Sequence, residues 1–143
     1  MSDSPFATGG CRCGAVTVTI HDAPKMMAQC HCRDCQKASG TGHFSLAFFA
    51  EEGVVVDGET KGYSVTTDSG NTSTRHFCPE CGSRIFGKNT GRPGMTSIPV
   101  GCLDDHGWYE PGAVVYAKRW EAWDITRTDI PNFDEMPPPP PSS

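Results

Sequence analysis

The chain has 143 residues, a length typical of one domain, with 12 basic and 17 acidic residues. The net charge of −5 excludes a basic nucleic-acid-binding surface as the main design, and no apolar run approaches the roughly 18 residues needed to span a bilayer. The 16 glycines and 12 prolines, with only 36% hydrophobic residues, favour a strand-rich fold with many loops over a helix bundle.

The two ends of the chain are expected to lie outside the folded core. The N-terminal MSDSPFATGG has neither the basic start nor the apolar segment of a secretory signal, so we expect a cytoplasmic protein with reduced thiols. Residues 1–8 are predicted to be flexible. The run PPPPPSS at 137–143 cannot pack into a core, and we predict a disordered tail over 136–143.

Between these ends the sequence predicts short strands and one helix. Residues 15–20, AVTVTI, alternate apolar and hydroxyl side chains, as a half-buried strand does. Arg33–Ser39 is predicted to form a short helix that ends at Gly40. Further strands are predicted at Phe44–Phe49, Val54–Val56, Gly62–Thr67, Ser73–Phe77, Ser83–Phe86, Met95–Leu103 and Ala113–Ala117. The prediction is a mainly β fold of about eight short strands and one short helix, in a single small β-sheet domain over 9–135.

The cysteines are unevenly spaced along the chain. They occur as Cys11-x-Cys13, Cys30-x-Cys32-x-x-Cys35, Cys78-x-x-Cys81 and a lone Cys102. Cysteines one or two residues apart are difficult to join in unstrained disulfides, whereas one bend of the backbone can direct two or three thiolates to one ion. This spacing in a reducing compartment predicts zinc binding.

One zinc site is predicted to be structural. The segment CPECG at 78–82 is a zinc-knuckle loop, and its glycine permits the tight turn. Two cysteines cannot complete a tetrahedral site, so the loop needs two further ligands. The Cys-x-Cys pair that precedes the first predicted strand is the natural source. We therefore predict a zinc ion bound by Cys11, Cys13, Cys78 and Cys81, which holds the small domain together.

A second zinc ion is predicted at Cys30, Cys32 and Cys35. Three protein ligands with an exchangeable fourth position are typical of catalytic zinc, whereas four protein ligands are typical of structural zinc. An alternative is that Cys102 supplies the fourth ligand, which would make both sites structural. A lone cysteine is more commonly a buried free thiol.

Three histidines are further candidates for the fourth ligand. His31, His43 and His76 lie near the cysteine clusters in sequence, but each is more typical of a polar surface residue or a residue that supports the ligands. His21 and His106 have no motif around them and are predicted to be surface residues.

Five segments carry a resemblance to a known family. They are GGCRCGAV at 9–16, QCHCRDCQKASG at 29–40, FCPECGSRIF at 77–86, VGCLDD at 100–105 and WDITRTDIPNF at 123–133. In this order they resemble the CENP-V/GFA domain family, named for glutathione-dependent formaldehyde-activating enzyme. The resemblance implies a β-rich fold built around two zinc ions with the ligand sets given above. It also implies a carbon–sulfur lyase that acts on a thiol adduct of a small carbonyl compound, with glutathione as the thiol.

The expected chemistry follows from the three-thiolate site. Zinc at an open site would hold a substrate thiol as thiolate near pH 7, and three cysteine thiolates would keep the bound sulfur electron-rich. Arg33 and Lys37 are placed either to meet the carboxylates of a glutathione-like thiol or on a solvated helix face. Asp34 and His31 are nearest in sequence for proton transfer, and the sequence identifies no catalytic residue.

Two other functions fit the same motifs. Zinc-stabilised β folds also serve as protein-interaction modules, and the fold alone does not decide between these roles. A labile three-thiolate cluster would also suit a protein that responds to zinc or to oxidants.

Overall fold

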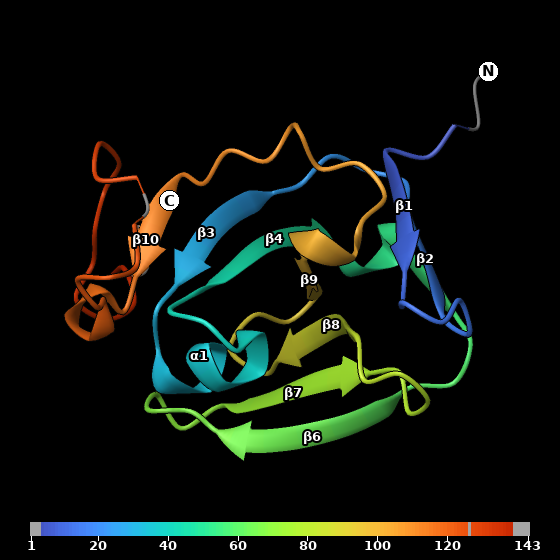
Figure 1. The fold of residues 1–143 in the computed structure, drawn as a ribbon, viewed down its shortest axis with the longest axis horizontal. Helices are drawn as coiled ribbons and strands as arrows, with labels where there is room; N and C mark the ends of the chain where they lie inside the picture. The colour runs from blue at the N-terminus through green and yellow to red at the C-terminus, as the bar shows by residue number, and fades with distance from the viewer. Residues whose placement is uncertain (1–3, 126, 139–143) are drawn as a thin grey trace. The chain divides into compact units, whose positions relative to one another are not determined.

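The computed structural model describes residues 4–125 and 127–138, and this part of the chain is mainly β, as predicted (Figure 1). The described residues form two compact units. One contains 4–26 and Leu46–Tyr109, and the other contains Met27–Ser45 and 110–138. The single domain predicted over 9–135 stays a prediction. No helix among the described residues is long and apolar enough to cross a membrane.

The first unit contains a three-stranded antiparallel sheet in the order β1-β2-β5, which is Ala7–Gly10, Thr17–Ile20 and Val54–Asp57. Alternate residues of β2 are buried, as its sequence predicts. β1 begins at Ala7, inside the segment 1–8 that was predicted to be flexible. Its ATGG sequence has weak strand propensity, and pairing with β2 overrides it.

The same unit contains a longer antiparallel arrangement in the order β4-β9-β8-β7-β6, with β4 from Leu46 onward (Figure 1). Phe49, Ile85 and Ile98 are fully buried among its strands. The strands have the bounds Phe44–Ala50 (β4), Met95–Pro99 (β9), Arg84–Asn89 (β8), Thr72–Phe77 (β7) and Lys61–Thr66 (β6). β4 pairs with β9 through residues 46–50.

The second unit is built around β3 (Met26–Cys30), α1 (Arg33–Ser39) and β10 (Ala113–Val115). β3 and β10 pair in parallel, with Cys30 opposite Val115. The helix has the predicted bounds, and Gly40 ends it in the left-handed conformation at φ 77°. No strand was predicted at β3, because its sequence MMAQC contains no β-branched or aromatic residue.

Three short 3₁₀ helices interrupt or follow strands: Glu51–Gly53, Val100–Cys102 and Ala117–Arg119. The strand predicted over Met95–Leu103 therefore ends at Pro99. The last predicted strand ends at Val115, because Tyr116 adopts the left-handed conformation at φ 56°. Most of the predicted tail, 139–143, lies outside the described residues.

Candidate metal centre

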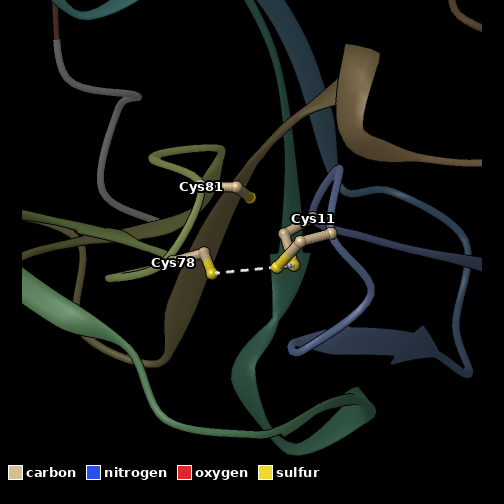
Figure 2. Close-up of side chains that lie close together, drawn as sticks. Cys11, Cys78 and Cys81 are labelled. Carbon is tan, nitrogen blue, oxygen red and sulfur yellow. Dashed lines mark hydrogen bonds between the residues drawn. The ribbon is translucent and has the colours of Figure 1, made fainter.

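The first unit brings together the four sulfur atoms of Cys11, Cys13, Cys78 and Cys81, which all lie within 4.8 Å of one another. The Cys13 Sγ lies 3.6 Å from that of Cys11 and 3.7 Å from that of Cys78. A tetrahedral zinc ion with Zn–S bonds of about 2.3 Å separates its sulfurs by about 3.8 Å. The spacing therefore fits zinc. Figure 2 shows the side chains of Cys11, Cys78 and Cys81 directed toward a common region.

Backbone groups and one serine hold this arrangement. The Val16 N–H points at the Cys11 sulfur at 3.2 Å, and the Gly82 N–H donates to the Cys78 carbonyl at 2.8 Å, with Gly82 in the left-handed conformation. The Ser83 hydroxyl accepts from the Arg12 N–H at 3.0 Å and lies 3.3 Å from the Cys81 sulfur. Ser83 thus links the two cysteine loops, a role that its sequence position does not reveal.

The thiols of this group influence one another's ionisation. Ser83 lowers the pKa of Cys81 to about 5 through its hydroxyl and its N–H. The Ala15 N–H is the strongest single influence on Cys13 and lowers its pKa, but the neighbouring Cys11, Cys81 and Cys78 thiols and desolvation together outweigh it, and the pKa of Cys13 rises to about 12. Thiolates this close repel one another, so they ionise together only when a cation neutralises them. A divalent ion satisfies this requirement.

The second unit brings together the sulfurs of Cys30, Cys32 and Cys35, again within 4.8 Å of one another. Cys30 ends β3, Cys32 is the N-cap of α1, and Cys35 lies in the first turn of the helix. The Cys35 N–H points at the Cys32 sulfur at 3.3 Å, an interaction that favours a thiolate there. The neighbouring Cys32 and Cys35 thiols raise the pKa of Cys30, so this group also requires a cation before all three can ionise.

Aromatic rings surround this three-cysteine group. Cys30 and Cys35 are buried with Val115, and Phe44, Tyr116 and Phe133 pack against them. Among the described residues outside glycine, Tyr116 alone has a positive φ, a conformation that costs about 1–2 kcal/mol. Strained backbone is common at functional sites. Sequence analysis missed these three rings, which lie far apart in the chain.

The other candidates for the fourth ligand lie elsewhere. Within 4–125 and 127–138, no fourth Cys, His, Asp or Glu joins the three-cysteine group. The Cys102 thiol lies 3.8 Å from the Ile85 carbonyl, and burial raises its pKa to about 12. His76 stacks on Phe86 with ring centroids 4.2 Å apart.

His31 and His43 form a third group with Asp124, a residue that sequence analysis did not select. The Nδ1 of His43 lies 2.8 Å from Asp124 Oδ2, and that of His31 lies 3.4 Å from the same oxygen. Burial, helped by the proximity of His43, lowers the pKa of His31 against the opposing effect of Asp124. The three residues come from the loop before α1, the segment before β4 and the segment after Ala117–Arg119.

Two exposed basic residues lie on one face of α1. Arg33 and Lys37 are four positions apart, and the Arg33 guanidinium donates to the buried Gln36 side chain. Asp34 is also exposed. Arg33, Asp34 and Lys37 belong to none of the three side-chain groups that could hold a metal ion in the described part of the chain.

The comparison with known families agrees with this geometry. Residues 6–119 match the family of the glutathione-dependent formaldehyde-activating enzyme (GFA). The chain belongs to this family. The family implies glutathione as a substrate or partner. A crystal structure of a Rhodobacter sphaeroides protein is similar in fold, with a TM-score of 0.57 and 19% sequence identity. The similarity covers 70% of this chain and 90% of that one.

Proposed function

We propose that this GFA-family protein is a zinc-dependent carbon–sulfur lyase. Its substrate would be the adduct of a small thiol, such as glutathione, with a small carbonyl compound such as formaldehyde. The observation that carries the proposal is the group formed by Cys30, Cys32 and Cys35. It offers three sulfur ligands, and no fourth ligand joins it in the described part of the chain. This donor set leaves a position for a substrate thiol.

We assign one zinc ion to each cysteine group. Cys11, Cys13, Cys78 and Cys81 would hold a structural ion, because four sulfurs complete the tetrahedron. Cys30, Cys32 and Cys35 would hold the second ion. Zinc bound there would lower the pKa of a substrate thiol, so that this thiol is present as thiolate near neutral pH. Thiol ligands must stay reduced, which supports a reducing compartment such as the cytoplasm for the proposed activity.

The protein's own residues determine which chemistry this site favours. Three cysteine thiolates carry three negative charges against the two positive charges of zinc. The resulting net charge of about −1 keeps a bound sulfur electron-rich and makes the ion a weak Lewis acid. The site therefore suits carbon–sulfur bond chemistry better than the activation of water for hydrolysis.

The bond changes of the proposed reaction balance without a further reactant. In the adduct-forming direction, the thiol sulfur bonds to the carbonyl carbon and the thiol proton moves to the carbonyl oxygen. In the lyase direction, the carbon–sulfur bond breaks, its electron pair returns to sulfur, and the hydroxyl proton is released. The rings of Phe44, Tyr116 and Phe133 beside the cysteines would limit the access of water. Arg33 and Lys37 are available to the carboxylates of glutathione from the exposed face of α1.

The test combines zinc analysis with a thiol titration. Zinc would be quantified per chain, and the metal's ligands would be followed by X-ray absorption as glutathione is added. We expect two zinc ions per chain, one of which gains a sulfur ligand from glutathione. Two four-sulfur sites that do not respond to glutathione would overturn the lyase proposal and favour a protein-interaction module. Loss of one zinc under mild oxidant, without thiol binding, would instead favour a redox-responsive protein.

A further inference from the structure

The group formed by His31, His43 and Asp124 has no role in the proposed reaction. It shares no residue with either cysteine group, and it lies entirely within the second unit. Its ligand atoms all lie within 4.8 Å of one another. From this arrangement we infer that the protein has a third metal site, in which two imidazoles and one carboxylate bind a divalent transition-metal ion of the zinc or iron(II) type.

The spacing of the three side chains suits such an ion. The Asp124 Oδ2 lies 2.8 Å from the His43 Nδ1 and 3.4 Å from the His31 Nδ1. Ligands about 2.0–2.2 Å from one ion are separated from each other by roughly 3 Å or slightly more. A small movement of the carboxylate therefore admits the ion. Two histidines and one carboxylate form the donor set of many zinc and non-haem iron(II) sites with open positions.

The His31 side chain is the independent observation that points to a ligand. Its side chain is 0% exposed, and neither ring nitrogen has a hydrogen-bond partner among the described residues. Buried polar groups are nearly always paired, and the exceptions often mark an absent ion or water. The hydrogen bond between His43 and Asp124 satisfies those two residues, whereas His31 has only the 3.4 Å approach of its Nδ1 to the same carboxylate and no hydrogen bond of its own. A bound ion accounts for all three.

The backbone of His31 is fixed from two sides. The Gln36 amide donates to the carbonyls of His31 and Arg119, each at 3.0 Å. The His31 N–H donates to the Val115 carbonyl at 3.0 Å. The Trp120 ring stacks on the His31 ring with centroids 4.9 Å apart. The imidazole is therefore held in place before any ion arrives, which is the requirement for a preorganised site.

Asp124 is held at its backbone, and its side chain is buried. The Trp120 Nε1 donates to the Asp124 carbonyl at 2.6 Å, and the Asp124 side chain is only 7% exposed. A Cβ at Gly42 would lie 2.4 Å from Asp124 Oδ2, so only glycine there allows this position of the carboxylate. His43 is the most accessible of the three ligands at 18% exposure, and it marks the side from which an ion would enter.

Cobalt(II) added to protein that carries two zinc ions per chain, one for each cysteine group, tests this inference. Cobalt bound by thiolates gives an intense sulfur-to-metal charge-transfer band, whereas cobalt bound only by nitrogen and oxygen does not. We expect wild-type protein to take up one equivalent of cobalt with visible d–d bands and without the thiolate band. Competition with zinc or with iron(II) under anaerobic conditions would show which ion the site prefers. No step uses glutathione, so the outcome is independent of the lyase proposal.

Three variants sharpen the result. His43→Asn should abolish the uptake, since it removes the most exposed ligand with little effect on the core. Gly42→Ala keeps all three ligands but displaces the Asp124 carboxylate, and we expect cobalt affinity to fall roughly 10–100-fold. His106→Asn is the matched control, because this exposed histidine belongs to no described metal-type group. The inference fails if wild-type protein takes up no cobalt, if the uptake shows the thiolate band, or if His43→Asn binds as wild type does.

Discussion

Replacing one cysteine in each cysteine group should separate the contributions of the two proposed zinc sites to stability. We compare Cys78→Ser in the four-cysteine group with Cys32→Ser in the three-cysteine group. Serine is close to cysteine in size but is a poor zinc ligand, so each variant weakens one site with little change in packing. The four-cysteine site joins loops that are distant in sequence, whereas the three-cysteine site joins neighbouring residues.

The expected magnitudes follow from the length of chain that each ion closes. Cys13 and Cys78 are 65 positions apart, and Cys30 and Cys35 are separated by only five. If a metal cross-link restricts the unfolded chain as a disulfide does, closing the longer loop contributes about 4 kcal/mol and closing the shorter one about 2 kcal/mol. Cys78→Ser should therefore lower the free energy of unfolding by about 2 kcal/mol more than Cys32→Ser does.

Thermal unfolding with parallel zinc analysis measures this difference. For a chain of this size, about 2 kcal/mol corresponds to roughly 4–8 °C in Tm. Each variant should lose about one zinc per chain, and Cys32→Ser should also lose the response to glutathione. Cys102→Ser is the control, since this thiol belongs to neither group among the described residues, and it should keep the zinc content of the wild type. If Cys32→Ser destabilises the protein as much as Cys78→Ser, the division into structural and catalytic sites is wrong.

Three further predictions concern single residues. Burial raises the pKa of Cys102 from 9.0 to about 12. At pH 9 its thiol should therefore react with iodoacetamide far more slowly in the native protein than in the denatured protein, which mass spectrometry can measure. Similar rates in the two states would refute this prediction. Ser83→Ala removes the hydroxyl beside the Cys81 sulfur and should weaken zinc binding in the four-cysteine group roughly 10–100-fold in a chelator competition, with the other zinc ion unaffected. Gly9→Ala places a Cβ 2.3 Å from the Cys102 carbonyl oxygen and should lower the free energy of unfolding in urea by roughly 1–3 kcal/mol. An unfolding free energy equal to that of the wild type would show that the backbone moves to admit the methyl group without loss of stability.

The features that were predictable from sequence are those encoded by neighbouring residues. The helix Arg33–Ser39 was predicted with its exact bounds, because Gly40 provides a local end signal. Spacing suggested the three-cysteine group and each half of the four-cysteine group, since one or two intervening residues restrict where the thiols can point. The two halves were joined by the ligand count of a tetrahedral site. The alternation in β2 likewise needs no knowledge of the remaining chain.

The features that sequence analysis missed depend on contacts between distant segments. β3 forms from a sequence with weak strand propensity because β10, about 85 residues later, pairs with it. Asp124 lies in the WDITRTDIPNF segment that contributes to the family resemblance, but nothing in that segment marks it as a ligand, and only the fold brings it to His31 and His43. Tyr116 adopts its left-handed conformation against the expected preference of a bulky side chain, so its backbone geometry was not predictable from its residue type.

The two cysteine groups also differ in when they become available during protein synthesis. The last sulfur of the three-cysteine group belongs to Cys35, and the last of the four-cysteine group belongs to Cys81, which follows 46 residues later. At about 5–20 residues per second, the first set of thiols is made roughly 2–9 s before the second is complete. The growing chain thus carries a three-thiol chelator before its four-cysteine site can exist. During synthesis, the site that we propose for catalysis is therefore the first of the two that can bind a metal ion.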